Sequence, residues 1–147
     1  MKIVKSLLAS SLLLAAVSSH AEALQAKRTP FNGTDLSGVY ACVGNDIHDG
    51  DGASTLTLTL DSKYSSGKSG AFKATVVAGP VTYSGSVVSN GKQLAMDFAN
   101  SDLSKKDYGV ALGTVKNVGK GKFRIQKFYY EPEYSGGSNG FELCTSK

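Results

Sequence analysis

Residues 55–60 have the sequence Thr55-Leu56-Thr57-Leu58-Thr59-Leu60, in which threonine and leucine alternate strictly. Successive side chains of a β-strand point to opposite faces of the sheet, so leucine occupies one face here and threonine the other. The pattern predicts a strand with one buried face and one face in solvent.

Seven further stretches have a similar character and are separated by turn signals. They cover residues 36–43, 72–77, 82–88, 93–99, 109–115, 122–130 and 141–144. Asn90-Gly91 is the dipeptide that type I′ hairpins favour, and Gly119-Lys120-Gly121 fits another tight turn. No window shows a convincing helical period with caps, so the sequence predicts an all-β protein with eight strands.

Eight short strands with short connections must each bury one face. They can do so as a closed barrel or as two packed sheets. A sandwich of the Greek-key type usually needs a long crossing connection, whereas every connection here is compatible with pairing between neighbours. We therefore expect an eight-stranded antiparallel up-and-down barrel, with a sandwich as the alternative.

The beginning of the chain has the parts of an export signal. A basic start with Lys2 and Lys5 precedes an apolar stretch of about a dozen residues, shorter than the ~20 that a membrane-spanning helix needs. Small residues permit cleavage after Ala21 or Ala23. We expect a signal peptide at 1–21, a leader at 22–34, a single barrel domain at 35–147, and a secreted or periplasmic location.

Both cysteines, Cys42 and Cys144, follow this signal. In an oxidising compartment an even pair normally forms a disulfide. Cys42 lies in the first predicted strand and Cys144 in the last, and a closed meander makes those strands antiparallel neighbours. We expect a Cys42–Cys144 disulfide that closes the barrel, although the same bridge could also join two sheets of a sandwich.

The side-chain pattern near these cysteines contains a conflict. Cross-strand partners share a face, so if Phe141 and Leu143 point inward, Cys144 and its partner Cys42 point outward. In residues 122–130, Phe123 and Ile125 share one parity, whereas Phe128 and Tyr130 have the other. We expect a β-bulge near Gln126–Lys127 that switches the parity.

The opening Leu36-Ser37-Gly38-Val39-Tyr40 resembles the Gly-x-Trp first strand of lipocalins and the similar strand of avidin-like proteins. Residues 35–60 resemble their first hairpin, and residues 83–98 resemble a later one. Tyr40 stands where those families have tryptophan. The resemblance implies a calycin-like antiparallel barrel that can enclose one cavity, but not biotin binding, since avidin-like sites use tryptophan and this chain has none.

The interior of so small a barrel holds side chains or one small ligand. The residues expected to face inward are bulky, which favours a filled interior over a ligand cavity. They are Leu56, Leu58, Leu60, Phe72, Val76, Leu94, Met96, Phe98, Leu112, Phe123 and Ile125.

The stretch 128–134 is the strongest candidate for a contact surface. Tyrosine offers apolar area and a hydroxyl at low entropic cost, so tyrosines mixed with acids are typical of binding loops. The candidate ligand- or partner-binding residues are Tyr129, Tyr130, Glu131, Glu133 and Tyr134. The alternative is that Phe128 and Tyr130 pack beneath a solvated loop.

Signals for a metal or a reaction are weak. Asp46, Asp49 and Asp51 are weak candidates for a cation site, but their spacing fails the pattern of a helix-flanked calcium loop. His48 is the only histidine after the signal, and no Gly-x-Ser-x-Gly elbow occurs. We expect no catalytic residue, no resident metal and no cofactor.

Removal of the signal leaves 14 basic and 12 or 11 acidic residues, a net charge of +2 or +3. This excess is too small to indicate nucleic acid or a membrane as partner. We expect an exported, non-enzymatic binding module for an unknown small ligand or protein, using the barrel mouth or the Tyr129–Tyr134 loop. The alternatives are an inhibitor of a hydrolase, by architecture only, or a hydrolase that uses Glu131 and Glu133.

Overall fold

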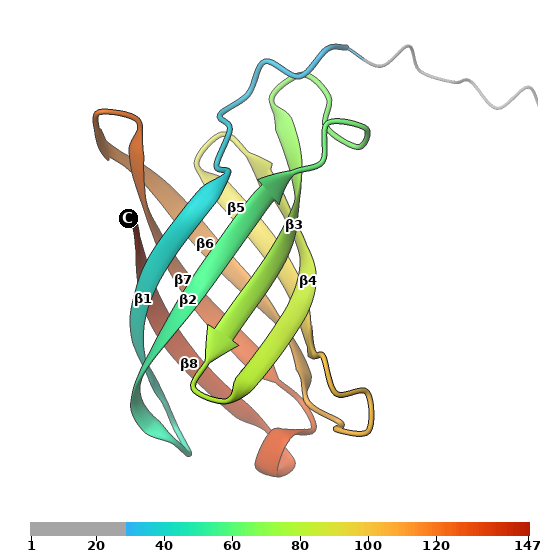
Figure 1. The fold of residues 1–147 in the computed structure, drawn as a ribbon, viewed down its shortest axis with the longest axis vertical. Helices are drawn as coiled ribbons and strands as arrows, with labels where there is room; N and C mark the ends of the chain where they lie inside the picture. The colour runs from blue at the N-terminus through green and yellow to red at the C-terminus, as the bar shows by residue number, and fades with distance from the viewer. Residues whose placement is uncertain (1–28) are drawn as a thin grey trace, which may run out of the picture.

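Residues 29–147 of the computed structural model form eight antiparallel strands that wrap into one closed barrel (Figure 1). The predicted signal peptide and residues 22–28 of the predicted leader lie outside the described residues. The strands are β1 (Gly38–Asp46), β2 (Gly50–Leu60), β3 (Ser69–Ala78), β4 (Val81–Asn90), β5 (Gln93–Asn100), β6 (Tyr108–Gly119), β7 (Lys122–Glu131) and β8 (Ser138–Ser146).

Each strand pairs with its sequence neighbours, and β1 pairs with β8 to close the barrel. At this closure Cys42 lies directly opposite Cys144, and the two form a disulfide. The expected antiparallel barrel, its strand order and the bridge across its seam are therefore confirmed. A closed sheet has no free edge at which another chain could add a strand.

The face that points inward differs from the expectation on several strands. Cys42 and Cys144 are buried in the interior, whereas Phe141 and Leu143 are exposed on the outside. The expected bulge near Gln126–Lys127 is wrong, because the β6–β7 register runs without a break from Val110↔Tyr130 to Asn117↔Phe123. Parity is conserved along β7, and Phe128 and Tyr130 are simply outward residues.

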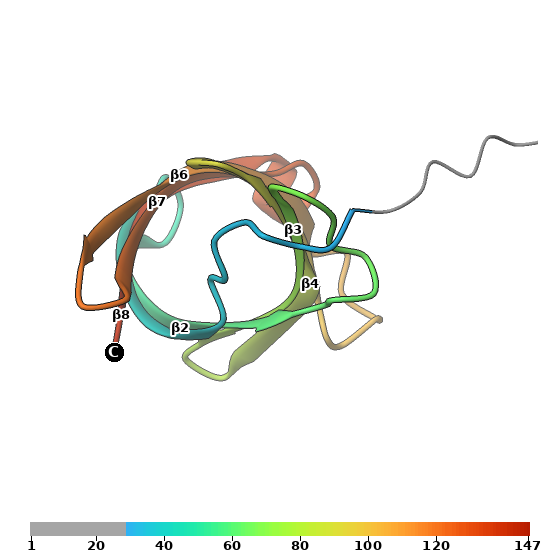
Figure 2. The same ribbon diagram turned by 90° about the horizontal axis from the view of Figure 1, so that it is seen from above.

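One end of the barrel is closed by the segment that precedes β1. Figure 2 shows this segment crossing the opening. Leu36 is 1% exposed, and its carbonyl accepts a hydrogen bond of 2.7 Å from the Tyr40 hydroxyl. Further out, Asn32 N donates to Gly67 O in the β2–β3 loop, and Gly67 N donates to Thr29 O. The packing of the barrel domain thus begins before residue 35.

The interior next to this closed end is a filled apolar core. Its side chains come from the segment before β1 and from all eight strands, with Cys144 as the contribution of β8. They include Leu36, Tyr40, Leu56, Leu58, Phe72, Val87, Leu94, Val115 and Ile125. Burial of apolar area at about 25 cal/mol per Å² is the main stabilising contribution here.

The other half of the interior is lined by smaller and more polar residues. On β6 the inward positions are Gly109, Ala111 and Gly113, whereas Leu112, which was expected to face inward, is 68% exposed on the outside. A side chain at Gly109 would lie 2.6 Å from the Phe98 ring, so glycine is what lets that ring lie against β6. The expected filled interior is therefore correct for only one half of the barrel.

Among residues 29–147 no helix is long and apolar enough to cross a membrane. The buried disulfide is consistent with an extracellular or periplasmic location, since such bridges persist in oxidising compartments.

We predict that the double variant Cys42→Ala/Cys144→Ala unfolds more easily in urea, by about 4–5 kcal/mol, because the bridge closes a loop of about 100 residues in the unfolded chain. Wild-type protein held in a reductant should match the variant. Equal unfolding free energies for the oxidised wild type and the double variant would contradict this.

Candidate functional site

A cavity of about 200 Å³ opens at the end of the barrel opposite the closed one. We call it the mouth cavity. The turns and loops between β1 and β2, β3 and β4, β5 and β6, and β7 and β8 surround this end. Its lining combines apolar, tyrosine and acidic side chains: Val76, Ala78, Met96, Phe98, Tyr83, Tyr129, Tyr134, Asp46, Asp49, Asp51, Glu131 and Glu142, with Lys127 as the single lysine.

Glu131 is the most unusual group in this wall. It is the last residue of β7, faces inward, is 7% exposed, and has no hydrogen-bond partner among the described residues. Burial, followed by the charges of Asp107, Asp46 and Asp49, raises the pKa of Glu131 to about 7. Its oxygens open onto the cavity, and a carboxylate this enclosed is costly to ionise when it has no donor.

Asp46 has the opposite environment. Its carboxylate accepts hydrogen bonds from the Ser138 hydroxyl at 2.8 Å, the Tyr129 hydroxyl at 2.9 Å, and the backbone N–H groups of His48 and Asp49 at 2.8 and 3.2 Å. Burial opposes ionisation, but these donors outweigh it and hold the pKa of Asp46 below its ordinary value. Asp46 is thus a saturated anion that fixes the β1–β2 turn.

Three aromatic rings form a continuous wall across β4, β5 and β7. The centroids of Tyr83 and Phe98 are 5.7 Å apart and those of Phe98 and Tyr129 are 6.2 Å apart, both edge to face. Burial and the hydrogen bond to Asp46 raise the pKa of Tyr129, so its hydroxyl stays neutral and donates. The wall therefore adds no negative charge.

Lys127 does not cancel the charge of Glu131. Its ammonium forms an ion pair with Glu142 across β7 and β8, and both side chains are inside the barrel. The other oxygen of Glu142 accepts a hydrogen bond of 2.8 Å from the Ser54 hydroxyl. Glu131 thus meets mainly other acids, and one of them, Asp107, has its Oδ1 buried without a partner.

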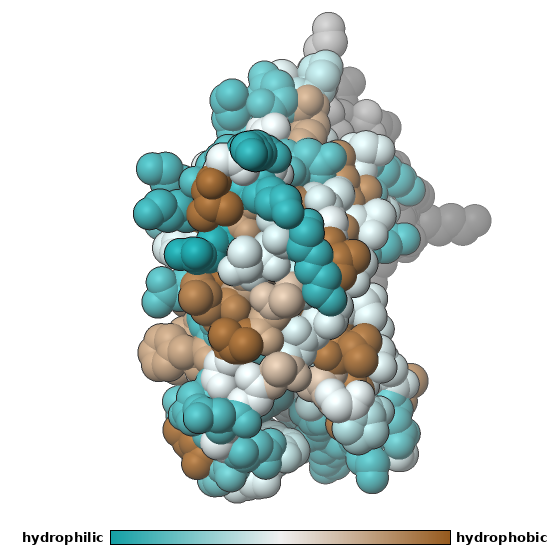
Figure 3. Space-filling model, turned by 60° about the vertical axis from the view of Figure 1, so that its left-hand side comes forward, coloured by the Kyte–Doolittle hydropathy of each residue, from teal (hydrophilic) through white to brown (hydrophobic). Residues whose placement is uncertain are grey.

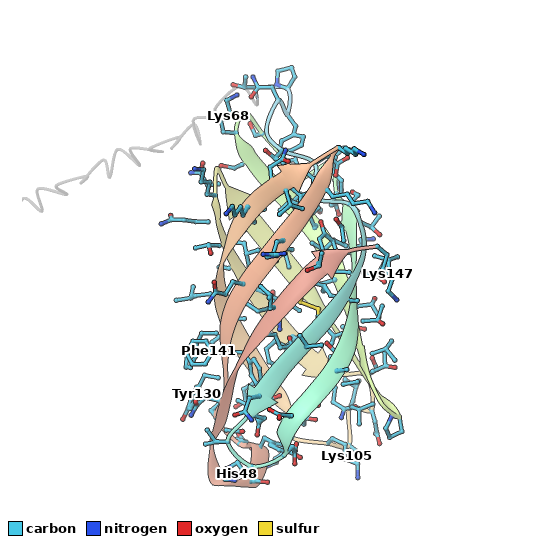
Figure 4. All side chains as sticks on the ribbon, turned by 90° about the vertical axis from the view of Figure 1, so that its left-hand side faces the viewer. His48, Lys68, Lys105, Tyr130, Phe141 and Lys147 are labelled. Atoms are coloured by element: carbon cyan, nitrogen blue, oxygen red, sulfur yellow. A yellow bond between two sulfur atoms is a disulfide. The ribbon has the colours of Figure 1, made fainter. Side chains whose placement is uncertain are left out.

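The loop between β7 and β8 is tied to the β1–β2 turn and closes one side of the mouth. The Tyr134 hydroxyl donates to Asp49 at 3.0 Å, His48 Nε2 lies 3.0 Å from Gly137 O, and Ile47 N donates to Asn139 O at 3.1 Å. His48 marks this end of the molecule in Figure 4. These contacts hold the Tyr134 ring in the cavity wall.

The structure divides the predicted binding residues into two groups. Tyr129, Glu131 and Tyr134 line the mouth cavity, so the barrel mouth and part of the aromatic loop are one site. Glu133 lies outside, where it accepts a hydrogen bond of 3.0 Å from the Tyr108 hydroxyl. Tyr130 also points outward (Figure 4).

Tyr130 belongs to an apolar outer face formed by β6, β7 and β8. Register pairs Val110 with Tyr130, Leu112 with Phe128, and Phe128 with Phe141, and all five side chains are exposed. Apolar residues gather on this side of the molecule in Figure 3. Phe128 and Tyr130 therefore do not pack beneath the loop, which was the alternative to a contact surface.

The three aspartates considered for a cation do not converge on one point. Asp46 is saturated, Asp49 accepts from Tyr134, and Asp51 accepts from Asn45 Nδ2 at 3.0 Å. Within residues 29–147, Cys42, Glu142 and Cys144 are the only three acid, histidine or cysteine side chains whose ligand atoms gather within 4.8 Å. Both cysteines of that trio are in the disulfide.

Several lining residues lie outside the predicted binding stretch, among them Tyr83, Phe98, Lys127 and Glu142. Charged residues at inward positions of β7 and β8 are the signal that was available. An inward orientation of Phe141 and Leu143 implies an outward Glu142, whereas the register with β1 places Glu142 inside.

Comparison with known proteins gives no match to any family model, curated protein or solved structure. The calycin-like resemblance therefore stays a prediction, as do the inhibitor and hydrolase alternatives.

We predict that Asp46→Asn lowers the unfolding free energy at pH 7 by about 2 kcal/mol, because it removes charge-assisted hydrogen bonds. The folded pKa of Asp46 is depressed, so the wild type keeps this advantage above about pH 4 and loses it as the pH falls further. Urea unfolding at pH 7 and pH 2.5 measures the difference in unfolding free energy between the wild type and Asp46→Asn. Asp51→Asn, at an exposed residue with one acceptor bond, is the control and should resemble the wild type at both values.

Glu131→Gln should have the opposite effect on the ligand-free protein. The folded pKa of Glu131 is about 7, so the unfolded chain loses this proton first and wild-type stability falls as the pH rises from about 4.5 to about 7. The variant should be more stable than the wild type at pH 8 by up to about 3 kcal/mol, and the gain should shrink at pH 5. Glu133→Gln is the matched control. A Glu131→Gln gain that does not change with pH would refute the assignment.

Proposed function

We propose that the protein is an exported, non-enzymatic binding module that holds a small molecule in the mouth cavity. The observation that carries the proposal is Glu131, a side chain only 7% exposed, whose carboxylate oxygens open onto the cavity and have no hydrogen-bond donor among residues 29–147. Such a group destabilises a ligand-free protein, and a ligand that pairs with it offsets that cost.

The form of the cavity supports a small ligand. An engineered apolar cavity of about 150 Å³ binds benzene, so a volume of about 200 Å³ corresponds by proportion to roughly eight non-hydrogen atoms. Concave sites with a mostly apolar wall and a few placed polar groups are typical of ligand binding. Tyr83, Phe98 and Tyr129 supply aromatic surface, and Glu131 is the acid of this lining that has no donor among residues 29–147.

The positions of the two loop glutamates support binding over hydrolysis. A glycosidase needs two carboxyl groups that flank one scissile bond. Glu131 faces the cavity, whereas Glu133 lies outside against Tyr108 and Lys106. The pair on which the hydrolase alternative relied therefore does not address a common substrate position.

Export is supported by two independent features. The predicted signal peptide at 1–21 would direct the chain out of the cytoplasm, and the Cys42–Cys144 disulfide is the kind of bond that persists there.

Blocking the cavity should abolish binding. Val76 lines the cavity and Val77, its neighbour on β3, is 44% exposed on the outside. We predict that wild type and Val77→Trp recovered from an exporting host carry a small molecule in native mass spectrometry, and that Val76→Trp does not. Circular dichroism checks that each variant is folded. Bare polypeptide masses for the wild type, together with no rise in its melting temperature on a screen of small metabolites, would contradict the proposal.

A further inference from the structure

We propose that the ligand of the mouth cavity is a small organic cation, with an alkylammonium or guanidinium head whose counter-ion is the Glu131 carboxylate. This inference rests on the proposed function, because it assigns a chemical class to the ligand of that same site.

The charge of the cavity wall is the first argument. After removal of the predicted signal the net charge is +2 or +3, yet the groups around Glu131 are mainly acids. The one lysine in the lining, Lys127, is paired with Glu142. The wall therefore has unpaired negative charge in a basic protein, which attracts a cation and repels an anion.

The acceptors in the wall are not equivalent, and this points to Glu131 as the group that meets the cation. Asp46 already receives four donors, and Asp49 and Asp51 accept from Tyr134 and Asn45. Glu131 has no donor among the described residues. Ammonium and guanidinium groups carry only donors, so either head supplies what Glu131 lacks.

The aromatic wall fits the same ligand class. The rings of Tyr83, Phe98 and Tyr129 stand in series beside this carboxylate site, and aromatic faces attract organic cations. Lys127 already uses this attraction, since its ammonium lies 5.2 Å from the centroid of the Tyr129 ring. Val76 and Met96 offer an apolar surface to the hydrocarbon part of the ligand.

A metal cation fits this wall less well than an organic one. Calcium and magnesium require several oxygen ligands around one point. Among the described residues no three acidic side chains bring their oxygens together in that way. An organic cation needs only one carboxylate and a surface for its apolar part.

Binding of a cation should be linked to the proton on Glu131. The site accepts the cation when Glu131 is ionised, and its pKa in the ligand-free protein is about 7. The groups that face it are Asp107, Asp46 and Asp49, which raise this pKa, and Lys127, which lowers it. Affinity should therefore be about 30-fold lower at pH 5.5 than at pH 8, and binding should release a proton near neutral pH.

The test uses three probes that share a ring and differ in charge: benzylamine, benzyl alcohol and benzoate, with agmatine as a guanidinium probe. Isothermal titration calorimetry on the full mature protein should show benzylamine and agmatine binding at least tenfold tighter than benzyl alcohol and benzoate. Glu131→Gln should lose at least tenfold in affinity for benzylamine and should abolish its pH dependence. Glu133→Gln, two residues away and outside the barrel, should bind as the wild type does.

The outcomes separate this inference from the proposed function. Equal affinity for benzyl alcohol and benzylamine, absence of binding by both amines, or wild-type affinity in Glu131→Gln would overturn the cation assignment. In each of these cases the proposed function survives if the wild type carries a neutral small molecule in native mass spectrometry and Val76→Trp does not. Benzylamine binding that survives Val76→Trp and Glu131→Gln would overturn both. Circular dichroism and thermal melting of Glu131→Gln separate lost binding from lost folding.

Discussion

The register between β1 and its two neighbours determines which side of every strand faces the interior. Leu56 lies inside and pairs with Tyr40, so Tyr40 also lies inside, and Cys42 follows two residues later. Cys42 pairs with Cys144, which pairs with Ile125 on β7. Two-residue steps along β7 from Ile125 then place Tyr129 and Glu131 in the cavity wall. Backbone pairing thus links the alternation in residues 55–60 to the inward position of Glu131. The disulfide fixes the pairing of β1 with β8, which closes the barrel.

The two halves of the interior have opposite effects on stability. The half beneath the segment that includes Leu36 is filled with apolar side chains and gives the favourable burial. At the mouth, the buried ion pair adds little and the glutamate without a donor opposes folding, so that of the three charged groups there only the saturated Asp46 stabilises the fold. Proteins have only a small margin of stability, so an unsatisfied acid persists only where the rest of the fold tolerates it. The apolar core, the closed sheet and the disulfide supply that tolerance here.

Most of the fold was predictable from the sequence, because strand alternation and turn dipeptides are local signals. The eight strands, the closure and the Cys42–Cys144 bridge were all expected. The inward face of β8 was not, because Phe141 and Leu143 are the more apolar pair locally, while the register with β1 places them outside. The pairing of Tyr40 with Leu56 in the first hairpin places Tyr40, and therefore Cys42 and Cys144, inside the barrel. This pairing follows only when the register is counted back from the β1–β2 turn. Tyr129, Glu131 and Tyr134 were named from their loop, whereas Tyr83 and Phe98 join them only in three dimensions.

The mouth cavity does not result from a shortage of large apolar residues. On β6 the inward positions near it are Gly109 and Ala111, and the outward positions between and beside them are Val110 and Leu112, which are 58% and 68% exposed. A shift of one residue in this strand would fill the interior and remove much of the apolar outer face. The sequence instead keeps small residues inside, and Gly109 gives room to the Phe98 ring and to the Glu131 side chain, whose Cγ lies 3.0 Å from where a Cβ would be. Gly109 therefore gives room to two side chains that both line the mouth cavity, the Phe98 ring and the Glu131 carboxylate.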